Sequence, residues 1–251
     1  MPQLHFNRKL SCFCLGLLSF AFNLVNPIDT LAQASGVTPQ VNIIGQMKDV
    51  MWKGQLQGKI RLDTLFPQMH LYGLGPLAYL SGEILVLDGK AYKASVTRQG
   101  GILVEETFAL EAPFFGYSHI AEWEEQPLPD SIVTLEELER WLQAQRQSPL
   151  RPFFFKLEGS VSSATIHIVN LPKGSKVSSP EQAHRGQRNY ALEQEEVEIL
   201  GFFSTEHQAV FTHHDTFLHL HLITKDRQKM GHVDAVRFSP GTVRLFLPLS
   251  L

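Results

Sequence analysis

Short apolar segments separated by turn residues recur along most of this chain. The clearest pair is residues 84–87 and residues 91–96, with Asp88-Gly89 in the turn between them. Asp-Gly between two such segments is a strong β-hairpin signal, because both residues adopt positive φ at little cost. The chain is therefore expected to build mixed or antiparallel β-sheets, and residues 103–110 are expected to form a further strand.

One amphipathic helix is predicted near the middle of the chain. Thr134 and Glu137 have the spacing of a capping box, in which the two side chains satisfy free backbone amides at a helix start. Leu135, Leu138 and Leu142 then recur on one helical face. This apolar face favours packing of the helix against a sheet.

The chain after residue 150 is predicted to be mostly β-structure. Residues 173–187 are rich in Gly, Ser, Pro and Gln and are expected to form a loop. The predicted fold class is α+β, with two sheet-based halves and few helices. The expected strands of the second half are residues 153–155, 164–169, 197–203, 216–224, 232–238 and 242–247.

The predicted organisation has four segments. They are a signal peptide at residues 1–34, an N-terminal α+β half at 35–130, a helix and linker at 131–149, and a β-rich half at 150–251.

The first segment has the features of a secretory signal. Arg8 and Lys9 precede the apolar residues 10–25, and Ala32-Gln33-Ala34 matches the small-x-small pattern of signal peptidase sites. An uncleaved anchor is the alternative, but the run is shorter than the roughly 20 residues of a spanning helix. We expect cleavage after Ala34 and export to the periplasm or the medium.

Cysteine content and charge exclude several classes of function. Cys12 and Cys14 both lie in the predicted signal, so the mature chain has no thiolate and no disulfide. The formal net charge is -3, with 22 Lys and Arg against 25 Asp and Glu. This balance argues against nucleic-acid binding, which needs an excess of cationic groups.

Two histidines at alternate positions are the clearest chemical signal. On a strand, His219 and His221 face one way, while the leucines between and beside them face a core. The polar residues 225–231 end in glycine and predict a hairpin turn, which places His232 beside the first pair. Three neutral imidazoles with an open position are a catalytic zinc arrangement. For a His-x-His pair alone, two polar surface residues are the alternative.

The adjacent pair His213-His214 is a poorer set of joint ligands. Neighbouring residues of a strand face opposite sides, so the two rings do not reach one ion together. His70 and His119 are interpreted as ordinary surface or core residues.

The histidine segment resembles the zinc-binding hairpin of the α-acetolactate decarboxylase family. The resemblance includes the spacing of all three histidines, the Asp226-Arg227 pair in the turn, and Gly231 before the last histidine. Residues 72–75 and 80–89 resemble the glycine-rich N-terminal signature of the same family, and Gly201-Phe202 is also in place. Together the similarity covers roughly residues 45–250.

The resemblance implies decarboxylation of 2-acetolactate to acetoin. It implies Zn²⁺ on the three histidines as a Lewis acid for the charge left by CO2. It also places Glu83 in the active site as the acid that protonates the product carbon. The implied partner is a small 2-hydroxy-3-oxo acid, and a homodimer is a further expectation. Without the resemblance, Glu83 would be interpreted as a solvated turn residue.

Two positions depart from the family pattern. His167 stands where the resemblance implies an active-site arginine, and an imidazole offers neither a permanent charge nor a bidentate fork. The implied acidic C-terminal tail, with its second glutamate, has no counterpart in the given chain. His167 is still predicted to be a catalytic residue, with an ordinary strand position as the alternative.

Three functions follow from these observations. The first is a zinc-dependent acetolactate decarboxylase. The second is a family member that retains zinc but acts on another small oxo acid, and the third is a non-catalytic zinc or ligand-binding protein of the cell envelope. The histidine hairpin with Glu83 favours the first function, whereas the two departures favour the others.

Overall fold

The structure, a computed structural model, describes residues 1–3, 39–144 and 151–249. The predicted signal sequence, apart from its first three residues, and both cysteines therefore lie outside the described residues. Contacts divide the chain into Met1–Ser35 and a unit Gly36–Leu251, and the second unit contains all the helices and strands named below. No helix of the described part is long and apolar enough to cross a membrane.

The first sheet is antiparallel, with six strands in the order β1-β8-β3-β4-β5-β6. Asp88 and Gly89 turn the chain between β4 and β5 with φ of 44° and 75°, so the predicted hairpin is confirmed. A small sheet of β2 and β7 pairs beside it. The strands are β1 (Asn42–Ile44), β2 (Ile60–Arg61), β3 (Leu71–Pro76), β4 (Glu83–Leu87), β5 (Lys90–Val96), β6 (Ile102–Glu106), β7 (Glu111–Ala112) and β8 (Phe115–His119).

The strand predicted at residues 103–110 is shorter than expected. β6 ends at Glu106 because the Thr107 hydroxyl accepts a hydrogen bond from the amide of Ala109 and turns the chain. The apolar residues that follow pack as a loop instead. The sequence pattern of residues 107–110 did not reveal this local side-chain competition for the backbone.

The second sheet also has six strands, in the order β11-β12-β13-β10-β14-β9. Because β10 pairs with β11 as well as with β13, strands β10 to β13 form a closed ring. β13 covers residues 161–167 of β10, and β14 pairs with residues 156–158 of the same strand, so β14 and β9 extend the sheet beyond the ring. The strands are β9 (Trp123–Pro127), β10 (Phe153–Ile168), β11 (Arg188–Phe203), β12 (Leu218–Thr224), β13 (Met230–Phe238) and β14 (Arg244–Pro248).

β10 and β11 are much longer than predicted, and β11 begins at Arg188 and not at residue 197. The expected strands at 153–155 and 164–169 are parts of the single strand β10, whose polar middle is paired on both sides. Gly159 in that middle passes Thr242 so closely that a Cβ would lie 2.2 Å from its carbonyl oxygen. Partner strands thus override the break that Gly159 and its polar neighbours indicate.

Few helices accompany the sheets, as predicted. α2 begins with the capping box: Glu137 accepts hydrogen bonds from the amides of Val133 (2.8 Å) and Thr134 (3.0 Å), and Thr134 accepts one from the Glu137 amide (3.4 Å). The predicted loop 173–187 contains one short helix. The helices are α1 (Met47–Lys53), α2 (Leu135–Ala144) and α3 (Pro180–Ala183), with 3-10 turns at Leu62–Thr64 and Ala78–Leu80.

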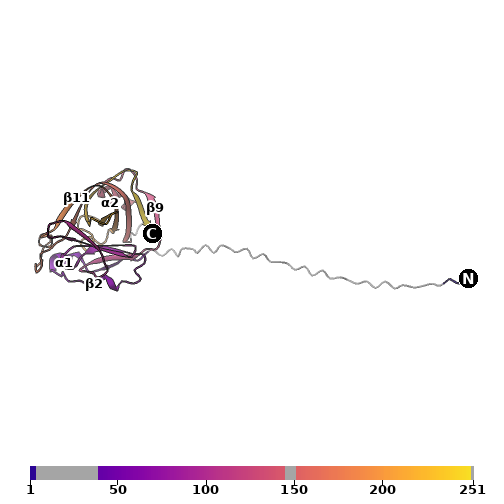
Figure 1. Cartoon of the computed structure of the whole chain (residues 1–251), viewed down its shortest axis with the longest axis horizontal. Helices are drawn as coiled ribbons and strands as arrows, with labels where there is room; N and C mark the ends of the chain where they lie inside the picture. The colour runs from indigo at the N-terminus through magenta and orange to yellow at the C-terminus, as the bar shows by residue number, and fades with distance from the viewer. Residues whose placement is uncertain (4–38, 145–150, 250–251) are drawn as a thin grey trace. The chain divides into compact units, whose positions relative to one another are not determined.

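The α+β fold with two principal sheets is confirmed, and its main core lies between them (Figure 1). Leu74 and Leu85 of the first sheet share this core with Leu200 and Phe202 of the second. A second core fills the interior of the β-ring and contacts α2. The domain division at 131–149 stays a prediction; β9, which precedes it, pairs within the second sheet.

A substitution at Gly201 of β11 tests how tightly this strand packs against β10. An added Cβ would lie 2.1 Å from the ring of Phe155, which is fully buried. We predict that Gly201→Ala lowers the free energy of unfolding by about 1–3 kcal/mol, as overpacking does. Gly101→Ala is the matched control, since its Cβ would meet only the Thr97 hydroxyl at 3.4 Å. Equal urea midpoints for the two variants would contradict this packing account.

Candidate metal centre

Strand register places His221, His232 and His167 in one row across the second sheet. His221 of β12 is paired with His232 of β13, and His232 is paired with His167 of β10. His219 lies two residues along β12, on the same face as His221. The ligand atoms that His219, His221 and His232 offer all lie within 4.8 Å of one another. The structure therefore brings together the three histidines that the sequence singled out.

The alternation predicted for β12 is confirmed. Leu218, Leu220 and Leu222 point into the core of the β-ring. The two histidines point toward the first sheet, where their cross-strand partners Leu200 and Phe202 belong to the main core. The site thus lies at the junction of the two sheets, and a shift of one residue in register would remove it.

Backbone carbonyls hold two of the rings in a defined orientation. His221 donates from Nδ1 to the carbonyl of Ile84 (2.8 Å), and His219 donates from Nδ1 to the carbonyl of Phe211 (2.7 Å). A carbonyl only accepts, so Nδ1 carries the proton and Nε2 keeps its lone pair in a neutral ring. Histidines that bind metals are commonly oriented in this way.

The free lone pair of His221 is buried. Its Nε2 has no hydrogen-bond partner within the described residues. A buried polar atom without a partner is costly, and a ligated metal ion would satisfy it. The donor set of three imidazoles and this orphaned nitrogen therefore fit a divalent metal ion.

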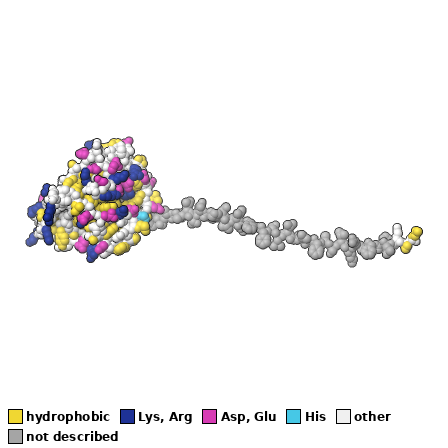
Figure 2. Space-filling view, in the orientation of Figure 1, with side chains coloured by type: hydrophobic (Ala, Val, Ile, Leu, Met, Phe, Trp, Pro, Cys, Tyr) yellow, Lys and Arg dark blue, Asp and Glu magenta, His cyan; other side chains and the backbone are white. Residues whose placement is uncertain are grey.

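Burial keeps the histidines neutral, as metal ligands must be. Exclusion from water lowers the pKa of His221 to about 3. The same cause holds the pKa of His219 and of His232 well below the usual value. Each of the three histidines is at most 8% exposed. On the face of the molecule in Figure 2, almost no histidine surface is visible.

Glu83 reaches the centre from the first sheet. It begins β4, is 3% exposed, and its Oε2 lies 3.6 Å from Nε2 of His221. Its Oε1 accepts a hydrogen bond from the amide of Val169 (3.1 Å). Burial raises the pKa of Glu83 to about 7, although the charge on His167 and this amide oppose the rise. Near neutral pH the carboxyl can therefore both hold and release a proton.

His167 lies beside the three histidines and is paired with an acid. Its ring stacks on His232 with centroids 4.6 Å apart, and its Nδ1 lies 2.7 Å from Oδ1 of Asp234. Burial opposes charge on this ring, but the hydrogen bond with Asp234 and the charge on Glu83 outweigh it. The pKa of His167 is consequently raised. The expected position beside the metal centre is therefore observed; its catalytic role remains a prediction.

Sequence reasoning missed two residues of the site, His184 and Asp234. It set aside a third, His213, by treating His213 and His214 as neighbouring strand residues, which is wrong because both precede β12. His184 follows α3 and His213 lies in the loop before β12, and both line the same small cavity as His219 and His232. The ring centroid of His213 is 5.3 Å from that of His232. Asp234 is on β13, two residues beyond His232, and this spacing on one strand was a usable signal. Nothing in the spacing of the loop histidines indicated their position.

The chain matches the family model described as "Alpha-acetolactate decarboxylase" over residues 43–247. It belongs to the alpha-acetolactate decarboxylase family. The chain is 23% identical over 208 residues to the alpha-acetolactate decarboxylase of Lactococcus lactis subsp. cremoris, and the match covers 82% of each chain.

Solved structures of the alpha-acetolactate decarboxylase family share this fold. Acetolactate decarboxylase from Bacillus subtilis subspecies spizizenii superposes with a TM-score of 0.67 at 18% identity, over 82% of this chain and 84% of that one. A Staphylococcus aureus protein of unknown function similar to this enzyme gives 0.66 at 18% identity, with the same coverage. The arrangement of the sheets is therefore common to these proteins.

The structure explains other residues of the family resemblance. Asp226 accepts a hydrogen bond from the Thr224 hydroxyl (2.6 Å), and Arg227, at positive φ, donates to Glu198 (2.7 Å). These contacts fix the β12–β13 turn. A Cβ on Gly231 would lie 2.6 Å from the carbonyl oxygen of His167, so glycine permits the close approach of β13 to β10.

The lowered pKa values make the metal-free protein sensitive to acid. His219, His221 and His232 bind protons in the unfolded chain below about pH 6.5 but not in the folded one. We predict that the free energy of unfolding falls as pH drops from 6.5 to 4.5, by about 1.4 kcal/mol per pH unit for each unmatched proton. Glu83 partly offsets this loss of stability. Its raised pKa means that the folded protein binds one proton more readily than the unfolded chain between pH 4.5 and 6.5.

Urea unfolding of the chelator-treated protein at pH 7.0 and 5.0 measures this effect. The His219→Gln/His221→Gln variant removes two of the titrating rings, so its loss of stability on acidification should be smaller. An equal loss in both proteins would show that the rings are not held neutral.

Proposed function

We propose that this protein is a zinc-dependent decarboxylase that converts 2-acetolactate to acetoin. The observation that carries the proposal is the joint placement of three neutral imidazoles and a buried carboxyl whose pKa is about 7. Membership of the alpha-acetolactate decarboxylase family and the enzyme of that name in Lactococcus lactis supply the substrate.

The donor set favours zinc among the divalent metals. Three imidazoles with an open coordination position are typical of catalytic zinc. A zinc ion held by His219, His221 and His232 would act as a Lewis acid for the negative charge that develops on the substrate oxygens. Carboxylate-rich sites, which suit magnesium or calcium, differ from this set.

Glu83 is assigned the proton transfer. When the bond between the carboxylate and C2 breaks, CO2 leaves. The electron pair of that bond stays on the remaining substrate, which becomes an enediolate. Glu83 then donates its proton to carbon, which yields acetoin, and regains a proton from solvent. Its buried position near His221 excludes most competing water.

His167 is assigned the substrate carboxylate. It is the imidazole of the cavity whose pKa is raised, and Asp234 holds its Nδ1. A positively charged ring would bind the anion before reaction and release it as neutral CO2. His167 would thus take the part that the family resemblance gives to arginine, with a hydrogen-bonded acid as support.

One observation favours a non-catalytic metal-binding protein as a second candidate. The cavity that Glu83 and the histidines line has a volume of about 30 Å³. This is room for about two water molecules, so 2-acetolactate needs a rearrangement of the lining to enter. Met47 and Met51 line the cavity and have flexible side chains that could supply this movement.

We also propose export after cleavage behind Ala34. The basic residues, apolar run and small-x-small site of residues 8–34 support it. Sequencing the amino terminus of the protein recovered outside the cytoplasm tests this, and an intact N-terminus on exported protein would contradict cleavage.

Acetoin formation by the zinc-loaded protein tests the activity. Glu83→Gln is predicted to retain zinc and to lower turnover by about 10²–10⁴-fold, the usual effect of losing an acid–base group. His167→Arg keeps a cation next to the substrate and should equal or exceed the wild type. Glu106→Gln is the matched control, since Glu106 is exposed on β6 and should leave turnover unchanged.

The outcome that would contradict the decarboxylase is specific. If the wild type, Glu83→Gln and His167→Arg proteins all carry zinc and none forms acetoin above background, the activity is absent. The second candidate then becomes the better description.

A further inference from the structure

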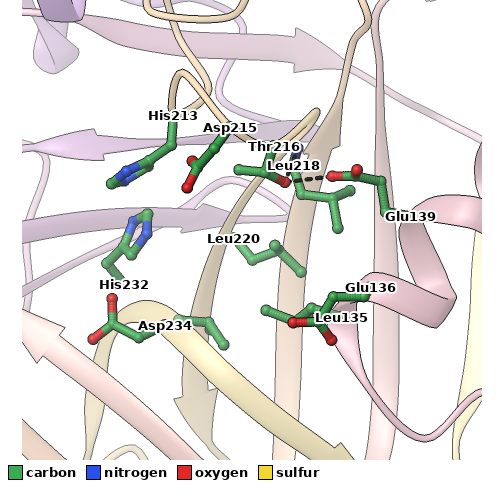
Figure 3. A pocket seen from close by; sticks show the side chains of 11 residues that line it. Leu135, Glu136, Glu139, His213, Asp215, Thr216, Leu218, Leu220, His232 and Asp234 are labelled. Carbon is green, nitrogen blue, oxygen red and sulfur yellow. Dashed lines mark hydrogen bonds between the residues drawn. The ribbon is translucent and has the colours of Figure 1, made fainter.

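An acidic pocket of about 430 Å³ lies against the outer side of the metal centre (Figure 3). Four carboxylates line it, and none of the described residues that line it is Lys or Arg. Glu139 accepts hydrogen bonds from the hydroxyl of Thr216 and the amide of Phe217. Glu136 and Asp215 have no side-chain hydrogen bond or ion pair to a described residue. The pocket therefore presents uncompensated negative charge.

The acidic pocket shares two walls with the buried cavity. His213 and His232 line both spaces, so these two side chains separate the acidic pocket from the buried cavity. In Figure 3, His213 and Asp215 lie across the pocket from His232 and Asp234. The inner three-histidine group is almost completely buried, so an ion needs a route through such a wall.

A second group of potential ligands stands in this wall. The ligand atoms of His167, His232 and Asp234 lie within 4.8 Å of one another. Asp234 is 33% exposed at its side chain, whereas His167 is 8% exposed. This outer group therefore reaches from the acidic pocket to the buried centre, and imidazole with carboxylate suits first-row divalent ions.

His232 belongs to both groups. Unlike His219 and His221, it has no hydrogen bond from either ring nitrogen to a described residue. His232 is 8% exposed, and its ring centroid lies 4.6 Å from that of His167 and 5.3 Å from that of His213. Because no hydrogen bond orients this imidazole, it can serve as a ligand in either group.

We propose that His167, His232 and Asp234 form a transient divalent-cation site through which the metal reaches the buried three-histidine centre. The acidic pocket concentrates the cation. The ion then binds the outer group, where it loses part of its water shell and His167 releases its proton to solvent, and His232 passes it to the inner ligands. The substrate, an anion, is repelled by the same carboxylates and is not expected in this pocket. The inference depends on the metal centre but not on decarboxylase activity.

Uptake of Co²⁺ by the chelator-treated protein tests the proposal. Stopped-flow absorption follows the visible bands that appear when histidines bind this ion. At low ionic strength, Asp234→Asn is predicted to take up Co²⁺ about tenfold more slowly than wild type, in line with the usual size of electrostatic steering. Its final absorption should equal that of the wild type, because the three inner ligands remain.

A second variant removes charge without touching the outer ligands. Glu136→Gln/Asp215→Asn should also slow uptake at low salt, and the difference from wild type should shrink at high salt. Glu106→Gln, which removes one exposed carboxylate from the first sheet, is the control and should match wild type.

Different results would contradict the transient site and the metal centre. Equal uptake rates for wild type, Asp234→Asn and Glu136→Gln/Asp215→Asn at low salt would overturn the transient site. Absence of Co²⁺ binding at equilibrium in the wild type would instead overturn the metal centre itself. If Asp234→Asn does not fold, the double variant decides the question alone.

Discussion

The hydrogen bond from Nδ1 of His221 to the carbonyl of Ile84 joins the two sheets at the metal centre. Ile84 lies next to Glu83 on β4, so the same contact sets the distance between the acid and the imidazole. It also fixes the ring so that its free nitrogen faces inward. The packing of one sheet on the other is thus a condition for the site, because neither sheet contains all of its parts.

The row of paired histidines across β12, β13 and β10 places His167 next to Asp234. An imidazole at position 167 can pair with Asp234 on the neighbouring strand, and the resulting pair lies between solvent and the buried ligands. A permanent cation at this position would oppose the approach of a metal ion from the acidic pocket. Under the proposed function, the departure that the family resemblance implies changes both the group that would face the substrate and the outer surface of the three-histidine group.

Local rules predicted those parts of the molecule that local interactions determine. The β4–β5 hairpin, the capping box of α2 and the alternation of β12 follow from turn chemistry, capping and strand period. The length of β10 and the closure of the β-ring depend on pairing between distant strands, which a single pattern does not contain. For the same reason, the three histidines that could hold a metal were recognisable from their spacing, whereas His184 and His213 reach the site from loops whose course tertiary packing decides.

The central claim is that His219, His221 and His232 form one metal site. Its most direct test is equilibrium zinc content of the purified wild type and of the His219→Ala/His221→Ala variant, with folding of both checked by circular dichroism. The account predicts about one zinc per wild-type chain, as for a single site with three protein ligands, and loss of that zinc in the folded variant. Undiminished zinc in the variant would contradict it, because the ion would then be held elsewhere.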